Sequence, residues 1–210
     1  MLENTSKRNQ YIRAGFLALA IAAIGLVIWK FDFEILFFIQ NYIRNDVLDF
    51  IVPLYTSLGE DGIIWIVLGL VLLIPKKYRK CGIMVLAALL VMLVVNNMIL
   101  KNIFARPRPC YYYPEIVDLV HVPKSYSFPS GHTVSAFAVA FTVFSQHKKL
   151  GIVTIVMAAI MGLTRLYVFV HFPTDVYGGV LVGAGIACIV YFAEKKISAE
   201  IRKRKEAKAQ

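Results

Sequence analysis

Hydrophobic residues along this chain are gathered into long runs and are not spaced at the period of one helix face or one strand face. Such runs predict helices that are apolar all round, as in a membrane, where roughly 20 residues cross about 30 Å of hydrocarbon. Lysines at the ends of the shorter runs can reach water from just inside the membrane. We therefore predict an all-α integral membrane protein, a bundle of six transmembrane helices. The uncharged or nearly uncharged runs are residues 14–29, 62–75, 81–100, 132–146, 150–163 and 176–193.

The first run follows three basic residues, a pattern that it shares with secretory signal peptides. The run is long, however, and it leads into the charged segment 30–34 instead of a small-residue cleavage site. We therefore expect an uncleaved first span.

Residues 31–57, between the first and second runs, alternate apolar and acidic positions and carry an aromatic-rich apolar side. This pattern is typical of an amphipathic helix that lies on a membrane surface. We predict an interfacial helix on the outer surface, with a partly re-entrant extension of the second span as the alternative. Apart from a basic tail at about 195–210, the sequence has no linker or repeat, so we expect one domain over residues 1–210.

The net charge of +10 among 210 residues would suggest a nucleic-acid partner in a soluble protein. If the N-terminus is inside, the two termini and the two loops on that side carry 16 of the 23 Lys and Arg residues and 4 of the 13 acids. The inside is then +12 and the outside −2, which follows the positive-inside rule. We expect a multi-pass protein of the plasma membrane with cytoplasmic termini, anionic lipid neighbours and no nucleic-acid partner.

Seven cations remain outside, and four of them are Lys101, Arg106, Arg108 and Arg165. An ionisable group at bilayer depth costs about 2.5 kcal/mol or more and is usually kept for function. These cations lie at the ends of apolar runs, together with two histidines and an aspartate. Cations in such a group can neutralise the oxygens of a phosphoryl group, so we predict a phosphate-handling site.

The fourth run is preceded by Pro129 and Ser130 and begins with Gly131 and His132. Ser130 is placed to be the N-cap of the helix, whose first turn then presents free N–H groups and a partial positive charge to an anion. Gly131 leaves room for an oxygen close to the backbone. His132 lies in the same turn and can donate a proton to a bound group.

His171 and Asp175 lie four residues apart where the sixth run begins, with Pro173 in its first turn. This spacing lets the carboxylate reach one imidazole nitrogen and fix the tautomer, which leaves the other nitrogen as a nucleophile. Arg165 ends the fifth run six residues before His171.

The three segments together resemble the signature of the type 2 phosphatidic acid phosphatase superfamily, which also includes vanadium haloperoxidases and bacterial acid phosphatases. The match covers about residues 101–175, and Thr164 departs from it, because the family usually has Ser there. Arg106-Pro107 offers a second register, which the spacing from Lys101 excludes. The matching segments are Lys101, six residues, Arg108-Pro109; Pro129-Ser130-Gly131-His132; and Arg165, five residues, His171, three residues, Asp175.

The resemblance implies that His171 is a nucleophile that forms a phosphohistidine, that Asp175 orients it, and that His132 is the acid for the leaving oxygen. It also implies a reaction without metal or cofactor, because cations take the place of a metal. The implied phosphate ligands are Lys101, Arg108, Ser130, Gly131 and Arg165.

We therefore expect a lipid phosphatase of the bacterial type with an outward-facing site, whose partners are membrane lipids and a lipid phosphate or pyrophosphate substrate. The compact chain favours undecaprenyl pyrophosphate, which is recycled to undecaprenyl phosphate for the cell wall. Phosphatidylglycerophosphate or a broad range of phosphatidic acids is the alternative. A non-catalytic lipid transporter is a distant one, a soluble haloperoxidase disagrees with six apolar runs, and a phosphotransferase stays open. The oligomeric state is unknown.

Overall fold

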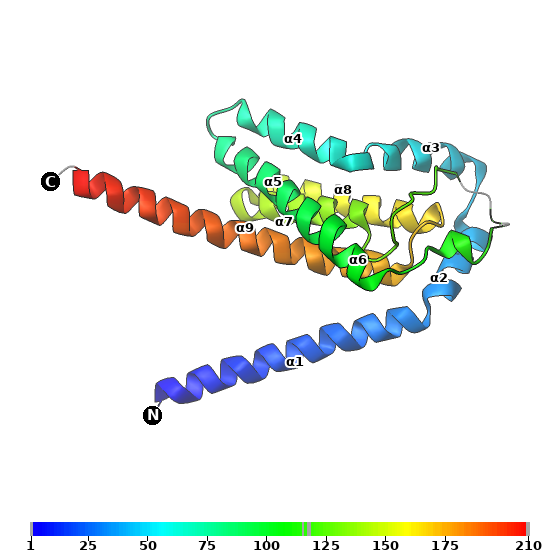
Figure 1. The fold of residues 1–210 in the computed structure, drawn as a ribbon, viewed down its shortest axis with the longest axis horizontal. Coiled ribbons are helices and arrows are strands. Elements are labelled where there is room, and N and C mark those ends of the chain that lie inside the picture. The colour runs from blue at the N-terminus through cyan, green and yellow to red at the C-terminus, as the bar shows by residue number, and fades with distance from the viewer. Residues whose placement is uncertain (1, 115, 117–118, 209–210) are drawn as a thin grey trace.

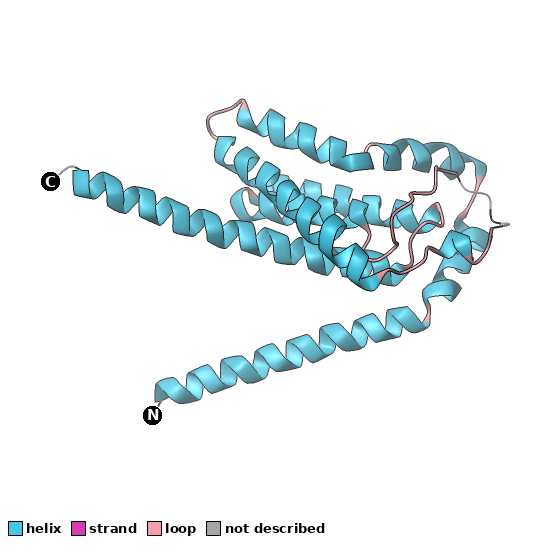
Figure 2. Cartoon of the chain, viewed as in Figure 1, coloured by secondary structure: helices cyan, strands magenta, loops and turns pink. Residues whose placement is uncertain are grey.

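The structure is a computed structural model that describes residues 2–114, 116 and 119–208. Most of the long helices run side by side in one body, and the first helix leans away from it (Figure 1). The regular structure of the described residues is helical throughout (Figure 2), which confirms the all-α prediction.

Each of the six predicted runs forms a helix. By length and composition, three helical stretches of the described chain can cross a membrane alone, and two bent helix pairs raise the number to five. The third run continues from α5 through the π-helix η3 (Leu93–Leu100) into α6 (Lys101–Phe104). The six helices are α1 (Leu2–Lys30), α4 (Ile63–Leu73), α5 (Arg79–Met92), α7 (Gly131–Gln146), α8 (Lys148–Tyr167) and α9 (Pro173–Lys208).

The remaining predicted span, α7, is the centre of the bundle. Its 16 residues extend about 24 Å, less than the thickness of the hydrocarbon. It packs against α5, α8 and α9, and its side chains from Thr133 to Ala140 are all buried. Glycine in α9 allows this close packing, since a Cβ at Gly183 would lie 2.8 Å from the backbone nitrogen of Ala138. α7 is therefore surrounded by protein, and its first turn lies inside the bundle.

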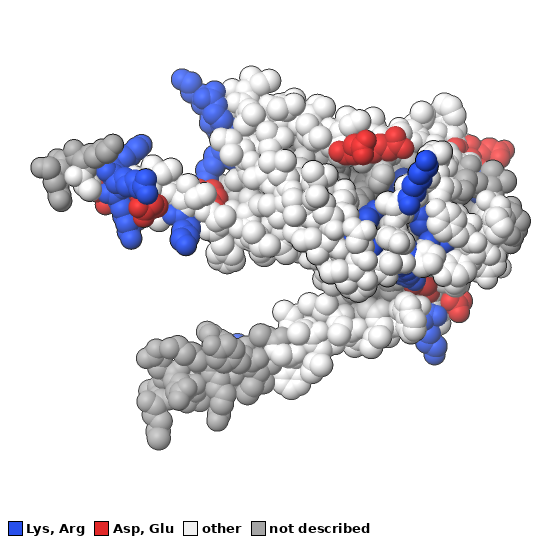
Figure 3. Space-filling view, in the orientation of Figure 1, with Lys and Arg blue, Asp and Glu red and all other residues white. Residues whose placement is uncertain are grey.

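The outer surface of the bundle is apolar, as a lipid-facing surface must be. Leu17, Ile74 and Leu90 are each more than 60% exposed. Figure 3 shows a broad uncharged band across the middle of the molecule, with Lys and Arg at the far end of α9 and beside the loop between α4 and α5.

Residues 31–57 depart from the single interfacial helix that we predicted. They form α2 (Asp32–Phe38), which continues as η1 (Ile39–Ile43), and a separate α3 (Asp46–Ser57). The helical structure is interrupted at Asn45, whose side chain caps α3 by accepting a 3.1 Å hydrogen bond from the Leu48 N–H. A 48° bend at η2 (Glu60–Gly62) joins α3 to α4, so α3 extends the second span, as in the alternative interpretation.

The predicted basic tail at about 195–210 continues α9 as a helix as far as Lys208. Residues 1, 209 and 210 lie outside the described part of the chain. The organisation as one domain over residues 1–210 stays a prediction.

Candidate active site

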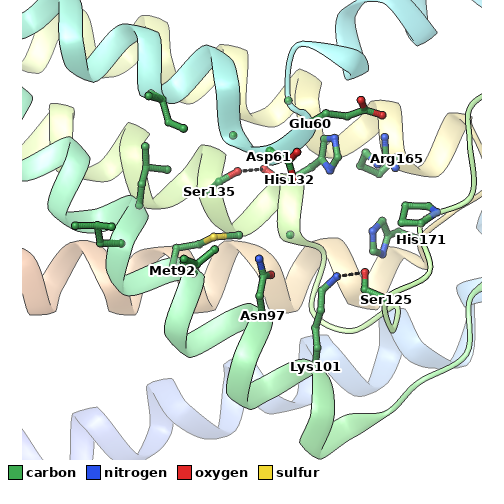
Figure 4. A pocket seen from close by; sticks show the side chains of 18 of the residues that line it. Glu60, Asp61, Met92, Asn97, Lys101, Ser125, His132, Ser135, Arg165 and His171 are labelled. Atoms are coloured by element: carbon green, nitrogen blue, oxygen red, sulfur yellow. Dashed lines mark hydrogen bonds between the residues drawn. The ribbon is translucent and has the colours of Figure 1, made fainter.

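A cavity of about 880 Å³ brings side chains from all three predicted segments together. Lys101 enters it from α6, His132 from the first turn of α7, Arg165 from the last turn of α8, and His171 from the loop 168–172 (Figure 4). Arg108, in the loop after α6, is the third cation of the lining. The cavity is therefore lined by three cations and by three imidazoles, those of His132, His171 and the exposed His121.

One nitrogen of His171, Nε2, carries no proton and accepts a hydrogen bond. Arg108 Nη1 lies 3.0 Å from His171 Nε2. A guanidinium can only donate hydrogen bonds, so Nε2 is the acceptor and the ring proton belongs on Nδ1. The lone pair of Nε2 therefore points toward Arg108, on the cation-lined side of the ring.

The other nitrogen of His171 faces Asp175 and Ser127. Nδ1 lies 3.4 Å from Asp175 Oδ2 and 3.3 Å from Ser127 Oγ, and the Ser127 hydroxyl donates to the same carboxylate oxygen. The Phe172 N–H donates to Oδ2 as well, at 2.8 Å. Asp175 is 0% exposed, and its Oδ2 lies on the Nδ1 side of the ring; its role in orienting His171 stays a prediction. The sequence did not point to Ser127.

The surroundings of His171 keep the ring neutral. The side chain is 2% exposed, and this burial lowers its pKa well below the ordinary value. The positive charges of Arg108, Arg165 and Lys101 lower the pKa further. A neutral imidazole is the form that can attack phosphorus.

Two of the cations are fixed by a segment that the sequence did not single out. Lys101 Nζ donates to Ser125 Oγ at 2.8 Å. Arg108 donates to the Ser125 carbonyl at 2.9 Å and to the Tyr126 carbonyl at 3.3 Å. Lys101 is 7% exposed and Arg108 is 1% exposed. Buried cations held in this way are preorganised to bind an anion.

Arg165 is held by Thr56, at the end of α3. Its Nη1 donates to Thr56 Oγ1 at 2.7 Å, and the Thr164 hydroxyl lies 3.1 Å from the same oxygen. Thr164 therefore keeps a hydroxyl contact at the position where the family usually has Ser. Arg165 Nε is buried and has no partner among the described residues, so one N–H remains for a bound oxygen.

His132 lies against the turn that joins α3 to α4. The ring packs closely against this turn, since a Cβ at Gly59 would lie 2.7 Å from His132 Cδ2. His132 Nε2 is buried without a partner among the described side chains and backbone groups. The same cavity holds His171, which is the arrangement that an acid and a nucleophile require.

The Pro-Ser-Gly-His segment is only partly in the cavity. Gly131 and His132 line it. Ser130 is at the N-cap position of α7, as predicted, but its side chain makes no cap bond and accepts instead from the Thr133 hydroxyl at 3.1 Å. Ser130 is 0% exposed and lies outside the cavity lining. Its role as a phosphate ligand stays a prediction.

The rest of the cavity lining is partly acidic and partly apolar. Glu60 and Asp61 are the acidic residues, and no three His, Cys, Asp or Glu side chains of the described chain are grouped as metal ligands. The apolar residues come from α4, α5 and η3, and they extend the site away from the cations. They include Ile66, Leu86, Leu89, Leu90 and Leu93.

A neutral imidazole with a lone pair among cations can accept a phosphoryl group, and a second histidine can protonate the leaving oxygen. The model of the PAP2 superfamily matches residues 80–198. The chain belongs to this superfamily, and the match is wider than the segment 101–175 on which the sequence motifs rested.

Several curated proteins and solved structures are similar to this chain. The chain is 31% identical over 153 residues to an undecaprenyl-diphosphatase of Sulfolobus acidocaldarius, covering 72% of this chain and 73% of the relative. It is 30% identical over 148 residues to the bacitracin transport permease protein BcrC of Bacillus licheniformis, covering 70% and 73%. The crystal structure of a transmembrane phosphatidylglycerolphosphate phosphatase from Bacillus subtilis matches with a TM-score of 0.66 and 26% identity, covering 85% of this chain and 96% of that one.

Aquifex aeolicus LpxE has a TM-score of 0.67 and 28% identity to this chain, covering 76% and 94%. These similarities agree with the fold and with the motifs. The protein is a multi-pass membrane phosphatase of the lipid phosphatase type.

Proposed function

We propose that this protein removes the terminal phosphate of undecaprenyl pyrophosphate through a phosphohistidine on His171. The observation that carries the proposal is the state of that side chain. Asp175 and Ser127 lie at Nδ1, and Nε2 is an acceptor that faces a cavity with three buried cations. The Arg108 bond to Nε2 marks the place where a phosphoryl group with its oxygens on the cations would replace it.

In the first step His171 Nε2 attacks the terminal phosphorus, and the bond from phosphorus to the bridging oxygen breaks. His132 gives its proton to that oxygen, and undecaprenyl phosphate leaves. In the second step water attacks the phosphorus of the phosphohistidine, the bond from phosphorus to His171 Nε2 breaks, His132 accepts a proton from the water, and inorganic phosphate is released. Lys101, Arg108 and Arg165 neutralise the charge on the transferred group in both steps.

The substrate proposal rests on the cavity and on the relatives. A site with cations at one end and leucines at the other suits an amphiphile whose phosphate is the head and whose tail is hydrocarbon. The relative from S. acidocaldarius is named as an undecaprenyl-diphosphatase and matches over most of both chains.

Phosphatidylglycerophosphate is the second candidate. A phosphatidylglycerophosphatase B of Bacillus subtilis is 38% identical to this chain over 112 residues, a higher identity over a shorter match of 48% of this chain.

The proposed orientation has the termini in the cytoplasm and the site at the outer face. The basic ends of the chain support this orientation, because basic segments favour the cytoplasmic side.

The test is phosphate release by the purified protein in detergent with EDTA, on undecaprenyl pyrophosphate, phosphatidylglycerophosphate and phosphatidic acid. We expect the highest kcat/KM for the pyrophosphate, by more than ten-fold. Activity should disappear in His171→Ala and persist in His147→Ala, a histidine at the opposite end of α7 that packs against Tyr78. A ten-fold preference for phosphatidylglycerophosphate would reverse the substrate assignment. Binding of these lipids without any phosphate release would favour a transporter.

A further inference from the structure

Arg106 points away from the phosphate cavity, although the sequence grouped it with the cations of the site. It does not line the cavity. Its guanidinium donates to Asp175 Oδ1 at 2.7 Å through Nη1 and to Asp32 Oδ2 at 2.7 Å through Nη2. The guanidinium also lies 3.9 Å from the centre of the Phe172 ring. Arg106 is thus placed between two carboxylates.

The two oxygens of Asp175 have separate partners. Oδ1 accepts from Arg106, and Oδ2 accepts from Ser127 and from the Phe172 N–H, next to His171 Nδ1. A carboxylate held at both oxygens cannot rotate about its Cβ–Cγ bond. Arg106 therefore determines which oxygen faces the imidazole and in which plane.

Asp32 completes this arrangement from a distant part of the chain. It is 4% exposed, and it accepts hydrogen bonds from the Thr174 N–H at 2.9 Å and from the Thr174 hydroxyl, next to Asp175. Arg106 Nη1 also donates to the Thr174 hydroxyl at 2.7 Å. Asp32, Arg106 and Thr174 thus form a closed set of hydrogen bonds behind Asp175, with the charge of one cation between two anions.

We infer that Arg106, held by Asp32, is a positioning residue that orients Asp175 and through it His171. The inference rests on the proposed role of His171 and Asp175. Asp32 lies at the start of α2, outside the matched region 80–198, so the N-terminal segment contributes to the site. The body of the bundle contacts α1 lightly, through bonds such as that from Tyr177 Oη to the Ile21 carbonyl. Asp32 is buried at the point where α1 meets α2, and its contact with the bundle is made through Thr174 and Arg106.

A purely structural role would anchor α2 and would change the stability or the amount of folded protein. A positioning role lowers kcat, because a nucleophile misplaced by about 1 Å reacts on the order of 10²-fold more slowly. It leaves KM nearly unchanged, because the phosphate ligands Lys101, Arg108 and Arg165 are untouched. A fall in kcat without a change in KM therefore indicates a positioning role, and a loss of folded protein alone indicates a structural one.

The experiment compares Arg106→Gln, Arg106→Lys and Asp32→Asn in detergent, with undecaprenyl pyrophosphate as the probe and with folding checked by gel filtration and thermal unfolding. We expect kcat to fall by on the order of 10²-fold in Arg106→Gln and about ten-fold in Asp32→Asn, with KM within about three-fold of the wild type. Arg106→Lys should recover about ten-fold of the loss, because an ammonium can still bind Asp175. The variant that combines Arg106→Gln with Asp32→Asn should be no slower than Arg106→Gln alone, because both residues act through the carboxylate of Asp175.

Asp49→Asn is the matched control. Asp49 also binds an arginine, with Arg44 Nε at 3.1 Å, and accepts from Tyr167 Oη at 2.6 Å, but it does not touch the site. Its kcat should equal that of the wild type. If Asp32→Asn does not fold, Thr174→Val removes one hydrogen bond to each of Asp32 and Arg106 and should lower kcat several-fold.

Wild-type kcat in the folded Arg106→Gln and Thr174→Val proteins would overturn the inference, and so would a loss that lies only in KM. The proposed function fails in a different way, because the wild-type protein itself would then release no phosphate.

Discussion

The two ends of the helix bundle both carry Lys and Arg, but these side chains are buried at one end and exposed at the other. At the site end Lys101, Arg108 and Arg165 are at most 7% exposed and have fixed hydrogen-bond partners. At the far end of α9 the side chains of Arg202 and Arg204 are both 76% exposed and pair with glutamates of the same helix. Such exposed pairs contribute about 0–1 kcal/mol.

The difference separates two meanings of the same residue types. The exposed cations fit an orientation signal next to anionic lipid, for which position within a few residues is unimportant. The buried cations would be costly without an anion, and their geometry matters. The histidines at the two ends of α7 follow the same division. His132 has a buried nitrogen without a partner among the described groups, and His147 packs against Tyr78.

Among variants that keep the nucleophile His171, the largest effect is expected at His132. His132→Gln should lower kcat on undecaprenyl pyrophosphate about 10²–10⁴-fold, because general acid catalysis of the leaving oxygen is lost. On p-nitrophenyl phosphate the loss should be smaller, since that leaving group needs little protonation. Steady-state kinetics on both substrates, with His147→Gln as the control, measures the difference. Equal losses on both substrates would argue against a role as the acid.

Removing one buried cation should cost nearly as much. Arg165→Gln should lower kcat/KM about 10²–10³-fold, because the charge that develops on the phosphoryl oxygens loses one preorganised donor. Arg204→Gln at the exposed end should change kcat/KM less than about two-fold, in keeping with the small energies of exposed charges. Similar losses in both variants would remove the distinction between the two ends.

Thr56 is expected to have a smaller effect through Arg165. Thr56→Val removes the hydroxyl that holds Arg165 Nη1, and hydrogen bonds to charged groups are worth about 1.5–3 kcal/mol. We expect kcat/KM to fall about ten-fold, measured beside Ser57→Ala, whose hydroxyl bonds the Leu54 carbonyl of its own helix. A wild-type value for Thr56→Val would show that Arg165 does not need this anchor.

The smallest effect is expected in the pH profile. The pKa of His171 is lowered by burial and then by Arg108, so the lone pair is available above that low pKa and is lost only when the pH falls through it. The acid limb of kcat/KM should therefore lie well below pH 6.5 for this group, the ordinary pKa of histidine. In Arg108→Gln the limb should move to higher pH, because one lowering charge is gone. A limb that does not move would contradict the assignment of that limb to His171.

Sequence motifs located most of the site because they tie side chains to helix ends. His132 follows an N-cap serine, and His171 and Asp175 are one helical turn apart, so local rules determine their placement. The break in the segment 31–57 had a local signal as well, since Asn45 precedes a helix that carries Asp46 and Asp49 in its first turn. The aromatic pattern of the segment alone does not reveal this break.

The supporting residues had no such signal. Thr56 is 109 positions from Arg165, and Asp32 is 142 positions from Thr174. A threonine or an aspartate in these places looks ordinary until the fold brings it to its partner. The position of Arg106 shows the same limit: spacing excluded it as the arginine of the motif, and only the structure places it between Asp32 and Asp175.

Whether phosphate becomes bonded to His171 is the central question. Purified protein would be mixed with undecaprenyl pyrophosphate that carries ³²P in the terminal phosphate, quenched in alkali within one turnover, and the labelled peptide identified by mass spectrometry. We predict an alkali-stable, acid-labile phosphate on His171 that forms and decays at rates compatible with kcat and is absent in His171→Ala. Label on His132, or full turnover by His171→Ala, would contradict the account.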